Sequence, residues 1–130
     1  MQNTILIIDD QLTARRMLEH YLGHFYTVVA EEKAEDALAY LKEGNKPKVI
    51  ILDIIMDGMS GIQFLERLQD MYEALPPIIM LTNVNNSQER IKCLELGIFG
   101  YMVKPCDPKE LKVKIDKIIA SEPEYFFKSE

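Results

Sequence analysis

The apolar residues of this chain follow two alternating patterns. Short runs of branched apolar residues, typical of strands buried on both faces, occur at Thr4–Asp9, Tyr26–Ala30, Val49–Asp53, Ile78–Thr82 and Gly100–Val103. Between these runs the apolar residues recur at helical spacing. The alternation predicts five strand–helix units with short connections, and therefore a parallel sheet covered by helices on both faces.

Capping and turn residues set the limits of the predicted helices. Asn86 and Asp107 are good N-cap residues, and Pro108 occupies the first helical position, which proline favours. On the first helix, which Gly23 ends, the residues expected to face the sheet are Leu12, Met17, Leu18, Tyr21 and Leu22. We expect residues 1–121 to form the folded domain and residues 122–130 to be a tail or the start of a linker.

Length, composition and charge narrow the class of protein. A chain of 130 residues suits one domain with a hydrophobic core, and 48% hydrophobic with 28% charged residues is typical of a soluble globular protein. The net charge of −6 disfavours nucleic acid and anionic membranes as direct partners. No apolar run approaches the ~20 residues of a membrane span, and Met1 leads into the first strand without a signal peptide. We therefore expect a cytoplasmic protein whose cysteines, Cys93 and Cys106, are reduced thiols.

Three carboxylates stand where predicted strands end. Asp9 and Asp10 follow the first apolar run, and Asp53 follows the third. In parallel sheets, ligands bind beyond the carboxyl ends of the strands, and converging carboxylates there are costly unless a cation meets them. Oxygen ligands of this kind suit Mg²⁺. Since Thr82 and Lys104 also follow strands, the sequence predicts a pocket for a phosphoryl group.

These residues form a set of motifs in a fixed order. The motifs are Asp9-Asp10, Asp53 followed by Met56 and Gly61, Leu81-Thr82, and Lys104-Pro105. In this set, over about residues 4–120, the chain resembles the receiver domain of two-component response regulators. The resemblance implies a flavodoxin-like three-layer α/β/α sandwich with five helices, in which the five parallel strands lie in the order 2-1-3-4-5.

The resemblance also implies a role for each carboxylate. Asp53 would be the phosphoacceptor. Asp10 and Asp53 would bind Mg²⁺ together with the backbone carbonyl of Ile55, while Asp9 would act through a bridging water. This ligand set agrees with the preference of Mg²⁺ for few carboxylates and several retained waters.

Four further residues would complete the switch. By resemblance, Lys104 supplies a positive charge to a phosphoryl oxygen, and Thr82 supplies a hydroxyl that moves towards another. Tyr101 would change rotamer together with Thr82, and the Lys104–Pro105 peptide bond, which orients the lysine, would be cis.

The resemblance implies partners and a limited chemistry. A histidine kinase or a phosphotransfer protein would donate the phosphoryl group. The receiver would signal to an output domain or target protein through the fourth helix, fifth strand and fifth helix, and phosphorylation is expected to promote a homodimer through that face. Its own chemistry would be restricted to phosphoryl transfer to itself and slow hydrolysis, so it would not be an enzyme in the ordinary sense.

Two positions depart from the usual receiver pattern. Asp57 stands where the family usually has proline, and Asn83 stands where it usually has alanine or glycine. Ile55 and Val84 occupy the positions that flank the phosphoryl group in the family, and neither can hold a water. We expect a crowded entrance that slows both loading and hydrolysis.

Three alternatives compete with this interpretation. A Mg²⁺-dependent aspartyl phosphohydrolase would place a general-acid aspartate two residues after the nucleophile, where this chain has Ile55. A flavin-binding carrier of similar fold would need a Ser/Thr/Gly-rich loop after the first strand, where Asp10 would repel phosphate. A receiver fold kept only as an interaction module, without phosphorylation, remains open because of Asp57 and Asn83.

Overall fold

The computed structural model describes residues 3–83 and 85–129. One parallel sheet forms its centre, with strands in the order β2-β1-β3-β4-β5. The strands are β1 (Thr4–Ile8), β2 (Thr27–Glu31), β3 (Val49–Leu52), β4 (Ile78–Thr82) and β5 (Gly100–Val103). The predicted fold class and strand order are confirmed, and β1 and β3 end one residue earlier than predicted, which leaves Asp9 and Asp53 just beyond them.

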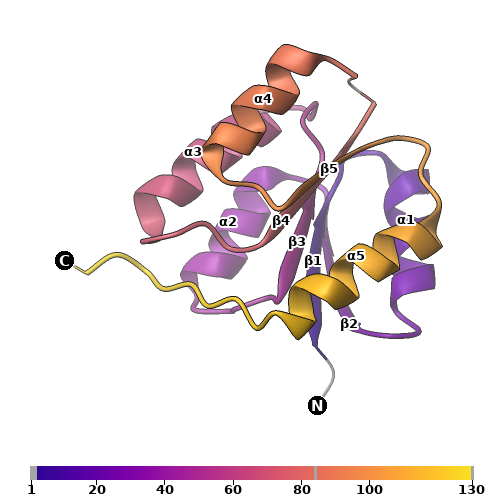
Figure 1. Cartoon of the computed structure of the whole chain (residues 1–130), viewed down its shortest axis with the longest axis horizontal. Helices are drawn as coiled ribbons and strands as arrows, with labels where there is room; N and C mark the ends of the chain where they lie inside the picture. The colour runs from indigo at the N-terminus through magenta and orange to yellow at the C-terminus, as the bar shows by residue number, and fades with distance from the viewer. Residues whose placement is uncertain (1–2, 84, 130) are drawn as a thin grey trace.

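Helices cover both faces of this sheet, as Figure 1 shows. Their bounds are α1 (Leu12–Leu22), α2 (Ala34–Lys42), α3 (Gly61–Met71), α4 (Ser87–Leu96) and α5 (Pro108–Ala120). Helices α2, α3 and α4 lie on one face, and α1 and α5 lie on the other. Within the described residues, no helix is long and apolar enough to span a bilayer.

The strands supply apolar side chains to two separate cores. On β1, Leu6 and Ile8 pack under α2 and α3, whereas Ile5 and Ile7 pack under α1 and α5. All four side chains are fully buried. Since successive strand residues point to opposite faces, burial on both sides explains the unbroken apolar runs in the sequence.

The predicted buried face of α1 is partly wrong. Leu18 and Leu22 are buried and Tyr21 is half-buried, but Leu12 and Met17 are 51% and 62% exposed. A helix turns by about 100° per residue. Measured around the helix axis from the direction midway between Leu18 and Leu22, Leu12 and Met17 therefore lie at least about 100° away. Their apolar side chains therefore lie on the surface.

Both predicted helix caps are confirmed. The Asn86 side chain accepts hydrogen bonds from the backbone of Gln88 and Glu89, and Asp107 caps α5. At α3, Ser60 and Gln63 form a reciprocal capping box that was not among the predicted caps. This cap fixes the start of α3, directly after the segment that follows Asp53.

The C-terminal segment folds back onto the domain. After α5, Glu122 adopts a left-handed backbone conformation, with φ 49°, and the chain reverses. Tyr125 is only 4% exposed. The division into a domain of residues 1–121 and a tail or linker of residues 122–130 stays a prediction, but residues 125–128 contact the domain.

Gly61 allows α3 to start close to the end of β3. A Cβ atom at Gly61 would lie 2.3 Å from the Asp53 carbonyl oxygen and 2.8 Å from the Ile54 Cα. The Gly61 N–H donates to the Ile54 carbonyl at 2.8 Å. Because the obstructing atoms are backbone atoms, they cannot move without displacing Asp53.

We predict that Gly61→Ala lowers the free energy of unfolding by at least about 2 kcal/mol, because the added methyl group overlaps fixed backbone. Urea denaturation measures this loss. Gly100→Ala is the matched control, since a Cβ there would meet its nearest atoms at 3.8 Å, and its effect should stay within about 1 kcal/mol. Equal losses in the two variants would contradict this explanation of Gly61.

Candidate phosphoryl and metal site

Three carboxylates meet at the carboxyl edge of the sheet. Strands β1 and β3 are neighbours, and Ile8 pairs with Leu52, so Asp9 and Asp53 leave the sheet side by side. One oxygen from each of Asp9, Asp10 and Asp53 lies within 4.8 Å of the others. Asp9 and Asp53 are only 3% and 4% exposed. The structure therefore brings together the carboxylates singled out in the sequence, in a largely buried position.

Lys104 lies between two of these carboxylates. Its Nζ donates to Asp9 Oδ2 at 2.6 Å and to Asp53 Oδ2 at 3.1 Å. The Lys104 backbone N–H donates to the Thr82 carbonyl at 2.7 Å, which fixes the lysine at the edge next to β4. Burial alone would lower the pKa of Lys104, but its hydrogen bonds and charge interactions with Asp9 and Asp53 outweigh burial and raise the pKa above its usual value. The side chain is therefore a firmly protonated cation.

Backbone N–H groups orient all three carboxylates. Asp9 Oδ1 accepts from the Gln11 N–H at 2.9 Å, and Asp53 Oδ1 accepts from the Ile55 N–H at 3.3 Å. Asp10 Oδ2 accepts from the Asp57 N–H at 3.1 Å. Proline, the usual residue at position 57 in receivers, has no N–H and cannot make this bond. Asp57 therefore ties the loop after β3 to Asp10 through its backbone.

Two polar contacts at this edge were missed in the sequence analysis. Glu35 Oε1 accepts from the Met59 N–H at 3.2 Å and so holds the loop that carries Asp57. Arg15 donates to the Asp9 carbonyl at 2.8 Å. Gly58, in the same loop, has φ 78°, a backbone conformation that favours glycine and is typical of a turn. The sequence around Gly58 does not indicate which distant side chain holds this loop.

Thr82 and Tyr101 lie on the two strands next to the carboxylates. Thr82 ends β4, is fully buried and pairs with Val103 on β5. Tyr101 is half-buried on β5 and pairs with Met80, and burial raises its pKa. The Lys104–Pro105 peptide bond, which follows β5, is cis.

The residues expected to limit access occupy different surroundings. Asn83 is exposed, and it lines a pocket of 250 Å³ together with Lys104 and Pro105. The Ile55 side chain is 63% exposed. Val84, the other expected flanking residue, lies outside the described residues. Of the two described residues that were expected to limit access, Asn83 and Ile55, Asn83 lines this pocket with Lys104.

The donor set at this edge suits a hard divalent cation. Carboxylate oxygens are the ligands that Mg²⁺ prefers, and the three carboxylates outnumber the one ammonium group, that of Lys104, that contacts them among the described residues. Asp10 makes no ion pair with a described residue, while Asp9 and Asp53 share Lys104. A cation held by Asp10 and Asp53 would balance the remaining negative charge.

Comparisons with known proteins converge on one family. The family model described as the response regulator receiver domain matches residues 5–116. The protein named "probable transcriptional regulator ycf27" from Porphyridium aerugineum is 38% identical over 88% of this chain and 47% of its own length. The transcriptional regulatory protein ResD of Bacillus subtilis is 32% identical over 96% of this chain and 52% of its own length. The chain thus spans about half the length of these curated relatives.

A solved structure agrees with the sequence comparisons. The chemotaxis protein CheY4 of Vibrio cholerae superimposes with a TM-score of 0.78 at 26% identity. The match covers 91% of this chain and 99% of that one. The shared region includes nearly the whole sheet and its helices.

We predict that Lys104→Met costs about 3 kcal/mol of unfolding free energy in EDTA, because two buried carboxylates lose their cation. The control is Lys112→Met, which breaks the more exposed Lys112–Asp116 pair on α5 and should cost less than about 1 kcal/mol. Urea denaturation of both variants provides the comparison. If Lys104→Met were as stable as the parent, Lys104 would not be balancing the carboxylates.

Proposed function

Because the chain belongs to the response regulator receiver domain family, we propose that it is a phosphoryl-accepting switch of a cytoplasmic two-component system. A histidine kinase or a phosphotransfer protein is the proposed donor, and Asp53 is the proposed acceptor. The observation that carries the proposal is the position of Asp53, buried at the sheet edge with Lys104 Nζ 3.1 Å from its Oδ2. An ionised carboxylate paired with a fixed ammonium group suits phosphoryl transfer.

The proposed reaction uses the residues at the sheet edge. A carboxylate oxygen of Asp53 attacks the phosphorus of a phosphohistidine, an O–P bond forms, and the P–N bond to the imidazole breaks. Lys104 then balances charge on a phosphoryl oxygen, and the Thr82 hydroxyl donates to another. Holding these groups on strand ends limits their motion, which favours an in-line approach.

Asp10 and Asp53 are proposed to hold Mg²⁺ with the backbone carbonyl of Ile55, and Asp9 to act through water. When bound, the ion would neutralise charge between the carboxylates and the incoming phosphoryl group. The Asp57 N–H supports this assignment, because it orients the Asp10 carboxylate from the loop side. Asp9 is held instead by Lys104 and the Gln11 N–H, which fits a role outside the direct ligand set.

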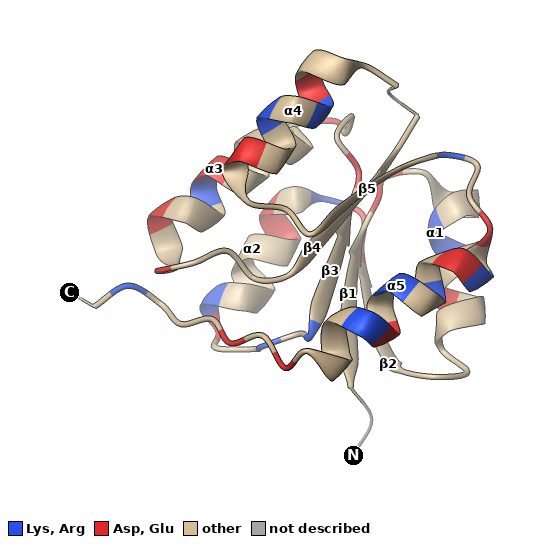
Figure 2. Ribbon diagram, in the orientation of Figure 1, with Lys and Arg blue, Asp and Glu red and all other residues tan. Residues whose placement is uncertain are grey.

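The proposed output is a surface formed by α4, β5 and α5. Thr82 on β4 and Tyr101 on β5, which are paired neighbouring strands, are proposed to link the site to this surface. Exposed apolar side chains lie along it, namely Ile91 and Leu94 on α4, Val103 on β5 and Val113 on α5. Figure 2 shows acidic and basic residues interspersed on α4 and α5. Apolar groups among charges of both signs suit a second copy of the chain or a target protein.

Asn83 is proposed to control access to the phosphoryl group. It is exposed, it directly follows Thr82 at the end of β4, and it lines a pocket together with Lys104, whose Nζ contacts Asp53. Ile55 and Val84, both apolar, offer no hold for an attacking water. We propose that loading and hydrolysis are both slow, which gives a long-lived phosphorylated state.

We predict that incubation with Mg²⁺ and acetyl phosphate adds about 80 Da, the mass of one phosphoryl group, to the parent chain. Intact mass spectrometry measures this gain. Asp53→Asn should abolish it, while Asp57→Asn, the same change at an exposed carboxylate four residues away, should retain it. An unmodified parent would favour the interaction module that works without phosphorylation, and rapid turnover of acetyl phosphate by the same sample would favour the phosphohydrolase.

A further inference from the structure

The C-terminal segment lies at the opposite end of the sheet from Asp53. From α5 it runs past the amino ends of the strands towards the end of α3 (Figure 1). Its contacts are with residues just before β3 and just before β4, whereas Asp53 follows β3. Any role of this contact is therefore separate from the phosphoryl site.

Tyr125 anchors the segment. Its side chain is 4% exposed, and its hydroxyl donates to the Pro47 carbonyl at 2.6 Å. Its ring meets the edge of the Tyr72 ring, with centroids 5.3 Å apart. A buried aromatic ring whose polar tip has a hydrogen-bond partner is a typical anchor of a recognised peptide.

Backbone hydrogen bonds hold the segment in an extended conformation. The Glu73 N–H donates to the Phe126 carbonyl at 3.0 Å, and the Lys128 N–H donates to the Met71 carbonyl at 2.8 Å. They enclose an antiparallel bridge between Tyr72 and Phe127, whose rings stack 4.8 Å apart at 13°. This is the pattern by which a peptide adds as a strand to a free backbone edge.

Ring contacts add to the backbone pairing. Tyr125 and Phe127 both meet Tyr72. The Lys46 ammonium lies 5.1 Å from the ring centre of Tyr125 and 4.8 Å from that of Phe126. Phe126 and Phe127 are 56% and 44% exposed, so Tyr125 is the buried anchor. Backbone pairing and these ring contacts define the surface that receives the segment, here called the groove.

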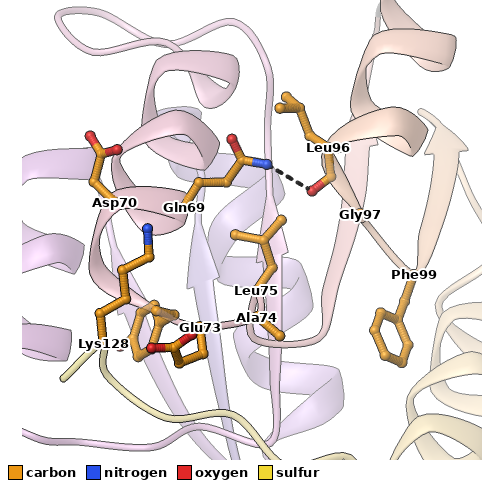
Figure 3. Close-up of a pocket in the computed structure, with 10 residues that line it drawn as sticks. Gln69, Asp70, Glu73, Ala74, Leu75, Leu96, Gly97, Phe99 and Lys128 are labelled. Carbon is orange, nitrogen blue, oxygen red and sulfur yellow. Dashed lines mark hydrogen bonds between the residues drawn. The ribbon is translucent and has the colours of Figure 1, made fainter.

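The groove adjoins a pocket, which Figure 3 shows. The walls of this pocket include Asp70 in the last turn of α3, Glu73 just after α3, Phe99 before β5, and Lys128 from the segment itself. The pocket has a volume of 640 Å³. The docked segment therefore supplies part of a wall beside the connection between α4 and β5.

We propose that the groove formed by Lys46, Pro47, Met71 and Tyr72 is a peptide-binding site, and that residues 124–128 are its occupant in this chain. Binding is reversible, because one buried ring and two backbone bonds oppose the conformational entropy lost when the whole segment is ordered. Such segments open at lower free energy than the core. When the segment leaves, the groove is free for an extended peptide of the same chemistry, with aromatic residues at alternate positions.

Amide hydrogen exchange on the full chain tests the occupancy. The Glu73 and Lys128 amides should be protected in the parent, and Tyr125→Ala should reduce their protection at least about tenfold while leaving the β3 and β4 amides protected. Phe25→Ala, which removes an exposed ring between α1 and β2, should retain protection. Tyr125→Phe, which loses only the hydroxyl bond to Pro47, should show a smaller loss. Unprotected amides in the parent, or full protection in Tyr125→Ala, would overturn the proposal.

A peptide added in trans tests whether the groove is a binding site. A fluorescein-labelled peptide of residues 122–130 should bind the Tyr125→Ala chain, measured by fluorescence anisotropy, and bind the parent at least about tenfold more weakly because the tethered segment competes. The same peptide carrying Tyr125→Ala should bind neither chain. Absence of binding to the Tyr125→Ala chain, or equal binding to both chains, would refute a peptide site.

Discussion

The excess of negative charge at the carboxyl edge of the sheet is the constraint on which the rest of this structure depends. Asp9 and Asp53 are nearly inaccessible to water, Asp10 stands beside them, and Lys104 alone among the described residues pairs with the cluster. Unbalanced buried carboxylates would destabilise the fold or become protonated. The site therefore calls for further positive charge, which Mg²⁺ would supply and which, in the proposed function, would prepare Asp53 to meet a phosphoryl group.

The fold serves this edge by placing particular strand ends together. Because β1 lies between β2 and β3, the carboxylates after β1 and β3 converge, and β4 and β5 bring Thr82 and Lys104 from the other side. Gly61 and the Ser60 cap turn the chain immediately after Asp53. The opposite edge is occupied by the C-terminal segment. The proposed phosphoryl site and the proposed peptide site thus lie at opposite ends of one sheet.

The residues at the strand ends could be predicted because the pattern that marks them lies in the sequence directly before them. The apolar runs marked the strands; Asp9, Asp53 and Lys104 directly follow β1, β3 and β5, and Thr82 is the last residue of β4. Leu12 and Met17 were assigned wrongly, since apolar residues at the margin of a helix face can lie on either side of the boundary. The docking of Tyr125 onto Pro47 and the hold of Glu35 on Met59 were not predictable, because each joins segments far apart in sequence that only the folded chain brings together.

The binding of Mg²⁺ tests the charge balance at the sheet edge most directly. Isothermal titration of the parent chain should give one Mg²⁺ per chain, because Asp10 and Asp53 leave room for one divalent ion. Asp10→Asn should abolish the binding, whereas Asp70→Asn, an exposed carboxylate at the far end of α3, should leave it unchanged. If Asp10→Asn bound Mg²⁺ as the parent does, the carboxylate cluster would not be the metal site, and the proposed preparation of Asp53 for phosphoryl transfer would be contradicted.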